Sequence, residues 1–328
     1  MVLLSKPSSE QYTYVRNNMP TTFSSSIPLV DLSNPDAMSL IVKACEDFGF
    51  FKVINHGIPL EAMAQLESEA FKFFSLPQTE KDKAGPANPF GYGNKRIGLN
   101  GDVGWIEYLL LTTNQEHNFS LHGKDIDKFR CLLKDYKSAM RKMACEILDL
   151  MAEGLKIQPK NVFSKLVNDE ESDCVFRVNH YPACPELAIN SGENLIGFGE
   201  HTDPQIISIL RSNNTSGFQI SLRDGSWISV PPDHSSFFIN VGDSLQVMTN
   251  GRFKSVRHRV LANGIDPRLS MIYFCGPPLS EKIAPLPSLM KGKESLYKEF
   301  TWFEYKSSTY GSRLADNRLG NYERIAAS

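Results

Sequence analysis

A series of short apolar segments between residues 173 and 275 most strongly limits the fold that this chain can adopt. Each segment has the length of a β-strand, and glycine, proline or asparagine separates one from the next. Residues 218–222 and 227–230 are the clearest pair, because the Asp-Gly dipeptide between them favours a hairpin turn. With a further strand predicted at 245–248, about eight strands follow one another, which is typical of a jelly-roll barrel.

The first half of the chain favours α-helices instead. Helices are predicted at 34–47, 59–74 and 125–153, where capping residues or apolar residues at helical spacing mark them. The glycine-rich segment 85–104 is predicted to be a loop that lets a ligand approach the backbone. These patterns predict an α+β fold: a double-stranded β-helix (jelly-roll) barrel core buttressed by N-terminal helices, with C-terminal helices near the barrel mouth.

We divide the chain into four parts, although no break in composition marks an independent domain. Residues 1–26 are polar and are predicted to form a flexible leader. Residues 27–170 make up a helix-rich N-terminal region, and residues 171–280 make up the jelly-roll core. Residues 281–328 mix polar and aromatic side chains, and we expect them to form helices that close the substrate pocket.

The composition disfavours several classes of protein. A net charge of −2 over 328 residues offers no basic surface for nucleic acid. No apolar run approaches the ~18 residues that span a membrane, and the N-terminus turns polar too early for a secretory signal. The six cysteines form no Cys-x-x-Cys motif, so we expect reduced thiols in a cytoplasmic protein. We expect a monomer or weak homo-oligomer whose partner is a small molecule.

One group of residues has the chemistry of a metal site. His201 and Asp203 alternate along a predicted strand, so both side chains can reach one ion, and His258 lies on another predicted strand. Two imidazoles and one carboxylate form the facial triad of non-haem Fe(II) oxygenases. The His-x-Asp pair alone is a weak signal, because the chain has 7 histidines and 37 acidic residues. Either histidine could also be a buried structural residue.

Arg268 and Ser270 repeat the alternate-residue spacing shortly after the distal histidine. They offer a fork-shaped cation and a hydroxyl to a carboxylate. The pair alone means little, because an arginine two residues from a serine is common. After three possible metal ligands, it predicts that a carboxylate ligand binds beside the metal.

In this order, the residues resemble those of plant 2-oxoglutarate/Fe(II)-dependent dioxygenases, from about residue 27 to about residue 318. The general motifs of that superfamily are matched at residues 48–57, 179–182, 201–203, 258–260 and 268–270. Segments similar to those of gibberellin 2-oxidases, particularly the enzymes that act on C19 gibberellins, lie at residues 90–93, 100–110, 212–217 and 247–256.

The resemblance implies roles for these residues. The three possible metal ligands would hold Fe(II) and, with Arg268, serve catalysis. Arg268 and Ser270 would bind the distal carboxylate of the cosubstrate 2-oxoglutarate. Tyr181 and Asn179 are further candidates for cosubstrate binding, although both could simply pack within a strand. The implied reaction consumes O2, admits ascorbate as a reductant, and hydroxylates C19 gibberellins at the 2β position, which inactivates the hormone.

A gibberellin is a rigid diterpenoid acid, so its pocket needs apolar walls and a partner for the carboxylate. The candidates are Arg96 and Tyr108 in the glycine-rich segment, Lys306 and Tyr310 near the C-terminus, and Phe238 in the barrel. Arg96 and Lys306 could equally be solvated surface charges, because most such side chains are exposed. Phe238 could equally belong to the core.

Two alternatives stay open on the sequence alone. The first is another plant 2-oxoglutarate oxygenase, such as a gibberellin 3-oxidase, a gibberellin 20-oxidase or a flavonoid oxidase, because loops and not barrel motifs choose the substrate. The second is a non-catalytic hormone-binding protein with a metal in a jelly roll. Arg268 and Ser270 argue against the second, since a structural metal site needs no second carboxylate pocket.

Overall fold

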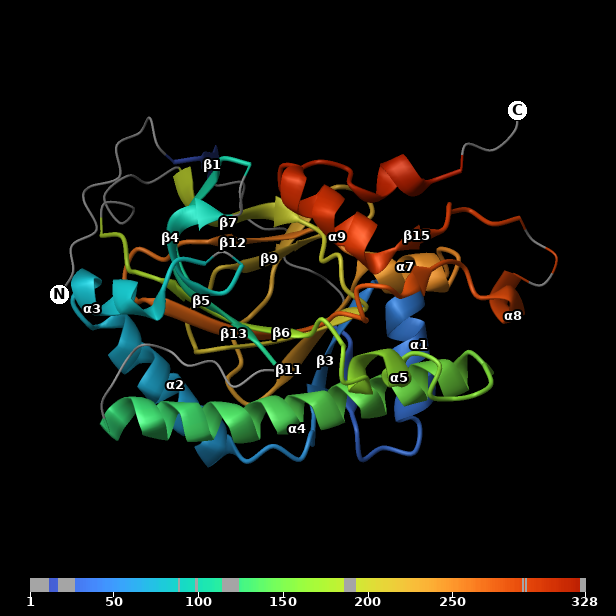
Figure 1. Cartoon of the computed structure of the whole chain (residues 1–328), viewed down its shortest axis with the longest axis horizontal. Helices are drawn as coiled ribbons and strands as arrows, with labels where there is room; N and C mark the ends of the chain where they lie inside the picture. The colour runs from blue at the N-terminus through green and yellow to red at the C-terminus, as the bar shows by residue number, and fades with distance from the viewer. Residues whose placement is uncertain are drawn as a thin grey trace.

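The computed structural model describes residues 12–16, 27–87, 89–97, 100–113, 124–185, 193–290, 292 and 294–324. Two β-sheets form the jelly-roll barrel, with helices around them (Figure 1). The larger sheet contains, in order, β2 (Leu29–Asp31), β3 (Phe50–Ile54), β11 (Phe237–Val241), β8 (Ile207–Ser212), β13 (Arg268–Cys275), β6 (Val175–Tyr181), β5 (Asp102–Thr112) and β4 (Gly91–Ile97). The smaller sheet contains, in order, β1 (Tyr14–Arg16), β7 (Glu193–His201), β12 (His258–Leu261), β9 (Phe218–Ser221) and β10 (Trp227–Ser229).

Alternation along the strands sends one set of side chains into the barrel and the other set toward the helices. In β6, Phe176 and Val178 join the apolar cluster that includes the helices. Val175 and Tyr181 join a second cluster, which contains residues of both sheets and fills the barrel interior. The inner face of β6 is therefore the face on which a buried site can form.

Helices cover the outer face of the larger sheet. The long helix α4 (Lys124–Gly154), which confirms the helix predicted at 125–153, lies along this face and contacts β8 and β13 (Figure 1). Its apolar stripe is buried, as the helical spacing predicts. The other helices on the N-terminal side and after α4 are α1 (Ala37–Asp47), α2 (Leu60–Phe74), α3 (Gln78–Lys81), the 3-10 helix Asp82–Ala84 and α5 (Ser164–Asn168).

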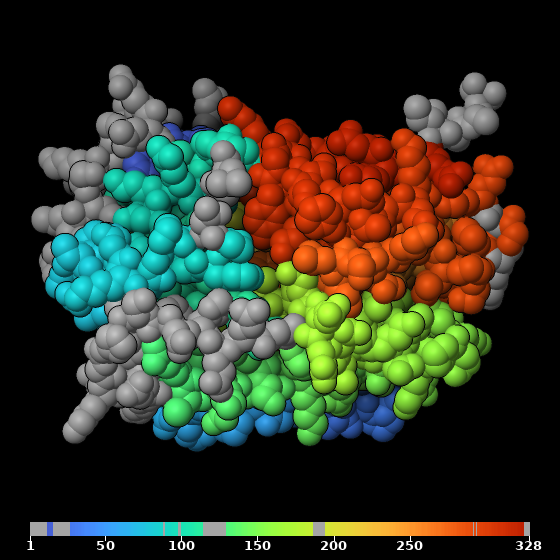
Figure 2. Space-filling view, viewed as in Figure 1, coloured from blue at the N-terminus to red at the C-terminus, as the bar shows by residue number. Residues whose placement is uncertain are grey.

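The C-terminal segment lies on the opposite side of the sheets from α4 (Figure 1). It contains β14 (Lys282–Ile283), α8 (Pro287–Met290), β15 (Phe300–Thr301), α9 (Trp302–Gly311) and the 3-10 helix Leu319–Tyr322. A capping box between Thr301 and Glu304 begins α9. The space-filling view shows this segment against the region of β4 and β5 (Figure 2), where the Leu314 N–H donates to Asp102 Oδ2 at 2.8 Å.

The strand predicted at 245–248 is wrong, because these residues belong to helix α7 (Asp243–Met248). Leu245, Val247 and Met248 are buried and Gln246 is half-buried, so the run has no exposed face. A short apolar run in the sequence does not distinguish a buried strand from a buried helix, because neither shows an alternation of apolar and polar residues.

The loop predicted at 85–104 is also wrong, because β4 and β5 form an antiparallel pair there. Part of the glycine content serves side-chain packing. A Cβ atom at Gly93 would lie 2.3 Å from Cζ of Tyr108, so glycine is needed for the Tyr108 ring to lie across the pair.

The flexible leader predicted at 1–26 is wrong for Tyr14–Arg16, which form β1 and pair with β7. Tyr12 is buried, and its ring packs edge-on against Trp105 at 5.4 Å between centroids. The rest of this segment lies outside the described residues. The N-terminal region expected at 27–170 supplies β2, β3, β4 and β5 to the larger sheet. No helix within the described residues is long and apolar enough to cross a membrane.

Candidate metal and cosubstrate site

Strand pairing brings the three predicted metal ligands together. His201 ends β7 and His258 begins β12, and the two residues are partners in the antiparallel register. Asp203 lies two residues beyond the end of β7, and its Oδ1 lies 3.6 Å from Nε2 of each histidine. One ligand atom from each of the three side chains lies within 4.8 Å of the other two. The geometry suits one divalent cation held by two imidazoles and a carboxylate.

Backbone carbonyls fix the orientation of both imidazoles. The Nδ1 atom of His201 lies 2.9 Å from the Gly199 carbonyl oxygen, and Nδ1 of His258 lies 3.2 Å from that of Val256. A proton on Nδ1 satisfies each contact and leaves a lone pair on Nε2 for a metal. Burial, followed by the charge of His258, lowers the pKa of His201 well below its ordinary value, so its neutral form is favoured.

The carboxylate of Asp203 is oriented in the same way. Its Oδ2 accepts a short hydrogen bond from the Ser208 hydroxyl, to which the Asn240 amide donates at 3.4 Å. Oδ1 is thereby left facing the two histidines. The sequence analysis missed Ser208, although a serine within the apolar run of β8 was a visible signal.

A buried carboxylate, Asp243, connects the ligand segment to the C-terminal helix α9. Its Oδ2 accepts hydrogen bonds from Thr202 at 3.0 Å and from the Tyr305 hydroxyl at 2.7 Å. Its backbone N–H donates to the carbonyl oxygen of Asp203 at 2.8 Å. Burial raises the pKa of Asp243, while the hydrogen bonds it accepts oppose that shift. The segment between His201 and Asp203 is therefore tied to α9.

The predicted cosubstrate residues lie on the inner face of neighbouring strands. Arg268 is the register partner of Tyr181, and Ser270 is the partner of Asn179. Arg268 is 1% exposed, and its Nε, Nη1 and Nη2 atoms have no hydrogen-bond partner among the described residues. Burial lowers the pKa of Arg268 below its ordinary value, which reflects the unfavourable placement of an unpaired cation.

The chemistry of this donor set fits the distal carboxylate of 2-oxoglutarate. A fork of buried N–H groups pairs with a carboxylate through charge-assisted hydrogen bonds, and such pairing offsets the loss of hydration. A pocket lies against Arg268, and its lining includes Phe218, Phe238 and Val230. Phe238, predicted as a wall of the substrate pocket, thus lines the space beside Arg268 and stacks on Phe50 at 5.5 Å between centroids.

The remaining predicted substrate residues do not gather at one place. Lys306 forms an ion pair with Asp173, with Nζ 2.7 Å from Oδ2. The Arg96 side chain is exposed, and its carbonyl oxygen accepts a hydrogen bond from the Tyr108 hydroxyl at 3.1 Å. Tyr310 is 39% exposed and has Lys306 Nζ 5.9 Å from its ring centroid. Of these four, only the Tyr108 ring packs within the barrel cluster.

Arg177 is an inner-face residue that the sequence analysis missed. Its guanidinium carbon lies 4.0 Å from the Tyr108 ring centroid and 5.0 Å from the Phe198 ring centroid. Its Nε donates to Asn179 Oδ1 at 2.7 Å, whereas Nη2 is buried with no hydrogen-bond partner among the described residues. Strand alternation was the signal, because residue 177 faces the same side as Asn179 and Tyr181.

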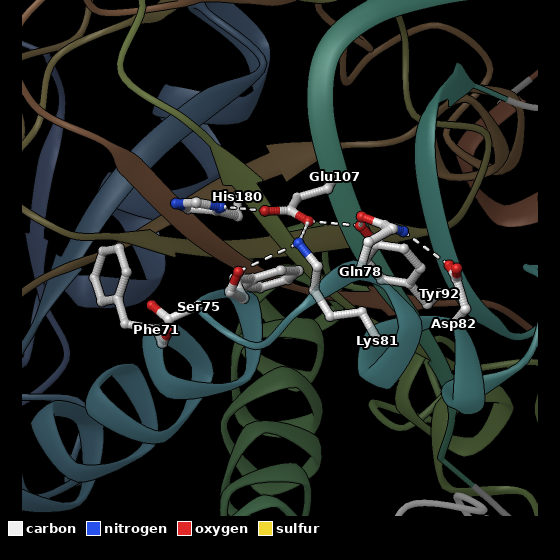
Figure 3. Close-up of polar contacts among 9 residues, drawn as sticks. Phe71, Ser75, Gln78, Lys81, Asp82, Tyr92, Glu107 and His180 are labelled. Carbon is white, nitrogen blue, oxygen red and sulfur yellow. Dashed lines mark hydrogen bonds and ion pairs between the residues drawn. The ribbon is translucent and has the colours of Figure 1, made fainter. Parts of the chain in front are cut away.

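The outer face of β5 and β6 holds a different group of charges, which the sequence analysis also missed (Figure 3). Glu107 contacts Lys81 Nζ at 2.5 Å, the Tyr92 hydroxyl at 2.6 Å and His180 Nδ1 at 2.8 Å. Burial disfavours ionisation of Glu107, but the hydrogen bonds from His180, Lys81 and Tyr92 outweigh it and lower the pKa of this carboxyl. We call these four residues the outer cluster. They join α3, β4, β5 and β6.

Two family models match the chain. The 2OG-Fe(II) oxygenase superfamily matches residues 172–277, and the model described as non-haem dioxygenase in morphine synthesis N-terminal matches residues 27–127. The first match includes every predicted ligand of the metal and of the cosubstrate. The second match includes the strands β2 to β5, which complete the larger sheet.

Curated relatives match over the whole length. Gibberellin 2-beta-dioxygenase 1 of Pisum sativum is 93% identical over 328 residues, which cover 100% of both chains. A gibberellin 2-beta-dioxygenase of Phaseolus coccineus is 60% identical, again with 100% of both chains covered. Gibberellin 2-beta-dioxygenase 1 of Arabidopsis thaliana is 56% identical and covers 99% of this chain and 98% of its own.

Solved structures share the fold. The crystal structure of JOX2 in complex with 2OG, Fe and JA has a TM-score of 0.83 and 26% identity, and the match covers 98% of this chain and 95% of that chain. A rice dioxygenase for auxin oxidation has a TM-score of 0.75 at 23% identity, with 91% of this chain and 100% of that chain covered. The predicted jelly-roll fold is confirmed.

Proposed function

Because this chain belongs to the gibberellin 2-beta-dioxygenases, a family of 2-oxoglutarate/Fe(II) oxygenases, we propose the following roles for its residues in the 2β-hydroxylation of gibberellins. The enzyme replaces the 2β hydrogen of a gibberellin with a hydroxyl group and thereby inactivates the hormone. 2-Oxoglutarate loses CO2 and becomes succinate, and one oxygen atom of O2 enters each product. Fe(II), with ascorbate as a reductant, supplies the activation of O2.

His201, Asp203 and His258 would hold the metal through two Nε2 atoms and Oδ1. The carbonyl oxygens of Gly199 and Val256 keep both imidazoles in the tautomer that binds metal. Two imidazoles and one carboxylate are the donor set that Fe(II) oxygenases use, so these residues would suit Fe(II).

Arg268 and Ser270 bind the distal carboxylate of 2-oxoglutarate, with Tyr181 and Asn179 beside them on β6. The observation that carries this proposal is the buried Arg268 guanidinium, whose nitrogens have no hydrogen-bond partner among the described residues, on the strand adjacent to β6. One dianion would then use both sites, with its distal carboxylate at Arg268 and its other end at the metal. The residues thus bring the cosubstrate and the metal together.

For the gibberellin, we propose a pocket with Tyr108 and Tyr310 as walls and a preference for C19 gibberellins. Lys306 and Arg96 are weaker candidates for its carboxylate, because Asp173 neutralises Lys306 and the Arg96 side chain is exposed. Phe238 is a weaker wall candidate, because it lies beside Arg268.

The test is a product assay with a panel of C19 and C20 gibberellins, Fe(II) and 2-oxoglutarate. We expect 2β-hydroxylated C19 products in a one-to-one ratio with succinate, and little product from C20 compounds. Hydroxylation at another carbon would contradict the proposal. Equal rates with C19 and C20 substrates would contradict only the preference. The relatives disfavour both a different plant oxygenase and a non-catalytic binding protein.

We also propose that the enzyme acts in the cytoplasm as a monomer or weak homo-oligomer without a nucleic-acid partner. The net charge of −2 and the six free cysteines support this proposal. Light scattering across a range of protein concentrations would test the oligomeric state, and a stable dimer at the lowest concentration would contradict it.

A further inference from the structure

Among the described residues of the barrel interior, Arg177 and Arg268 have buried nitrogens without a hydrogen-bond partner, and the proposed binding of 2-oxoglutarate accounts for Arg268. We propose that the second, Arg177, binds the carboxylate of the gibberellin substrate. This inference rests on the proposed function, because that function supplies a substrate with a carboxylate. The inference identifies Arg177 as the residue that orients the substrate.

The Arg177 guanidinium is held in one orientation. Its Nε donates to Asn179 Oδ1 at 2.7 Å, and its guanidinium carbon lies 4.0 Å from the Tyr108 ring centroid and 5.0 Å from the Phe198 ring centroid. One hydrogen bond and two ring contacts thus restrict the guanidinium. Nη2 remains buried and has no hydrogen-bond partner among the described residues. An immobilised fork with a free donor is preorganised for an anion.

The position of Arg177 relates it to the metal ligands through a single ring. Phe198 contacts both Arg177 and the His201 imidazole, and the centroids of the Phe198 and His201 rings are 4.6 Å apart. An acid bound at Arg177 would therefore lie one aromatic ring away from the metal ligands. A rigid substrate that extends from this anchor can present a distant C–H bond to the metal.

No described carboxylate takes the role of counterion by direct contact. Asp203 exerts an electrostatic effect on Arg177, but its oxygens face Ser208 and the two histidines. Burial of an unpaired cation is unfavourable, so a buried Nη2 without a described hydrogen-bond partner points to an anionic ligand. The two other cations proposed for the substrate are less suitable, since Lys306 is paired and Arg96 is exposed.

The experiment compares each gibberellin acid with its neutral methyl ester in wild type and in Arg177→Met. Methionine keeps an unbranched apolar stem between the two rings but removes the charge. We expect the KM for the acid to rise at least about 30-fold, as when one partner of a buried charge pair is removed. Wild type should prefer the acid over the ester, and Arg177→Met should lose that preference.

Two readouts separate failure of this inference from failure of the proposed function. In Arg177→Met, the KM for 2-oxoglutarate should change much less than the KM for the gibberellin acid, although Arg177 contacts Asn179 beside the cosubstrate. If wild type yields no 2β-hydroxylated product, the proposed function fails. If Arg177→Met retains the wild-type preference for acid over ester, the assignment of Arg177 fails.

Arg318→Met provides the matched comparison. Arg318 is a second buried arginine with an electrostatic effect on His201, but it comes from the C-terminal segment and its Nε donates to Arg313 O at 3.4 Å. We expect Arg318→Met to keep the preference for the acid, and loss of the preference only in that variant would overturn the proposal. If Arg177→Met does not fold, Arg177→Lys replaces it and should keep part of the preference for the acid, because lysine retains the charge. Equal use of the acid and the ester by wild type would also contradict the assignment of Arg177.

Discussion

On the outer face of β5 and β6, the buried charges of Lys81 and Glu107 are paired, and His180 and Tyr92 complete the contacts (Figure 3). On the inner face of β6 and β13, Arg177 and Arg268 keep buried nitrogens without a hydrogen-bond partner among the described residues. The two faces are only one residue apart along β5, since Glu107 points to the outer face and the neighbouring Tyr108 points into the barrel. A paired buried charge becomes costly only when its partner is removed, whereas an unpaired buried charge is unfavourable until a ligand supplies the partner.

The largest expected effect comes from removing a metal ligand from the inner side. His258→Ala should abolish metal binding and 2β-hydroxylation, because one imidazole and one carboxylate are too few ligands to hold the ion. The melting temperature without metal should not fall substantially. Calorimetric Fe(II) titration and the product assay measure the first effect, and the exposed His234→Ala variant is the control. Turnover by His258→Ala would remove this residue from the site.

The outer cluster should show the opposite pattern. Glu107→Gln should lower the free energy of unfolding by about 3–5 kcal/mol, because it leaves the buried Lys81 without a counter-charge. The KM for 2-oxoglutarate should stay close to wild type. Urea denaturation and initial rates test both expectations. Glu80→Gln removes an exposed ion pair with Lys83 and should change stability by less than about 1 kcal/mol.

The same variant has a defined pH dependence. The hydrogen bonds lower the pKa of Glu107 below its ordinary value of 4.5 in the folded chain. The stability from ionised Glu107 is therefore present above pH 4.5 and is lost as the pH falls through the lowered value. Denaturation at a series of pH values should show the wild type and Glu107→Gln curves converging below pH 4.5. A constant difference would contradict this assignment.

Arg268→Met should reduce cosubstrate binding without a loss of stability. Removing a cation that contacts a buried carboxylate weakens binding by about 2–5 kcal/mol, so the KM for 2-oxoglutarate should rise at least about 30-fold. The ligand-free melting temperature should stay unchanged or rise, because the variant no longer buries an unpaired charge. Arg252→Met, at a more exposed ion pair, is the control. An unchanged KM for 2-oxoglutarate would refute the role of Arg268.

The smallest expected effect concerns the link between α9 and the metal ligands. Tyr305→Phe removes the hydrogen bond to Asp243, which also holds Thr202 between the ligands. Loss of such an outer contact should weaken metal affinity by about tenfold. Competition with a metal-binding dye measures the affinity. Tyr310→Phe, whose side chain is partly exposed, should leave metal affinity unchanged.

The inner face could be predicted in large part because its evidence is local. His201 and Asp203, like Arg268 and Ser270, lie two residues apart, and strand alternation places each pair on one face. The outer cluster could not be predicted from the sequence, because Glu107 and His180 are brought together only by the register of β5 with β6. Sequence also does not reveal a counter-charge, so the pairing of Lys306 with Asp173 was not foreseen.

The fold, like the site, could be predicted only where the evidence lies close together in the sequence. Long helices and the hairpin of β9 and β10 follow from period and turn residues. Helix α7 does not, because burial on all sides removes the period that would distinguish it from a strand. The pairing of β4 with β5 was hidden because glycine, which favours loops, is used at Gly93 to admit the Tyr108 ring.

The hydrogen bond from Tyr305 to Asp243 also orders events during translation. The ribosome adds Tyr305 after His201, Asp203 and His258, so a nascent chain can acquire all three ligands before α9 secures the segment between two of them. The hydrogen bond that ties α9 to the candidate metal site can therefore form only when almost the whole polypeptide has been synthesised.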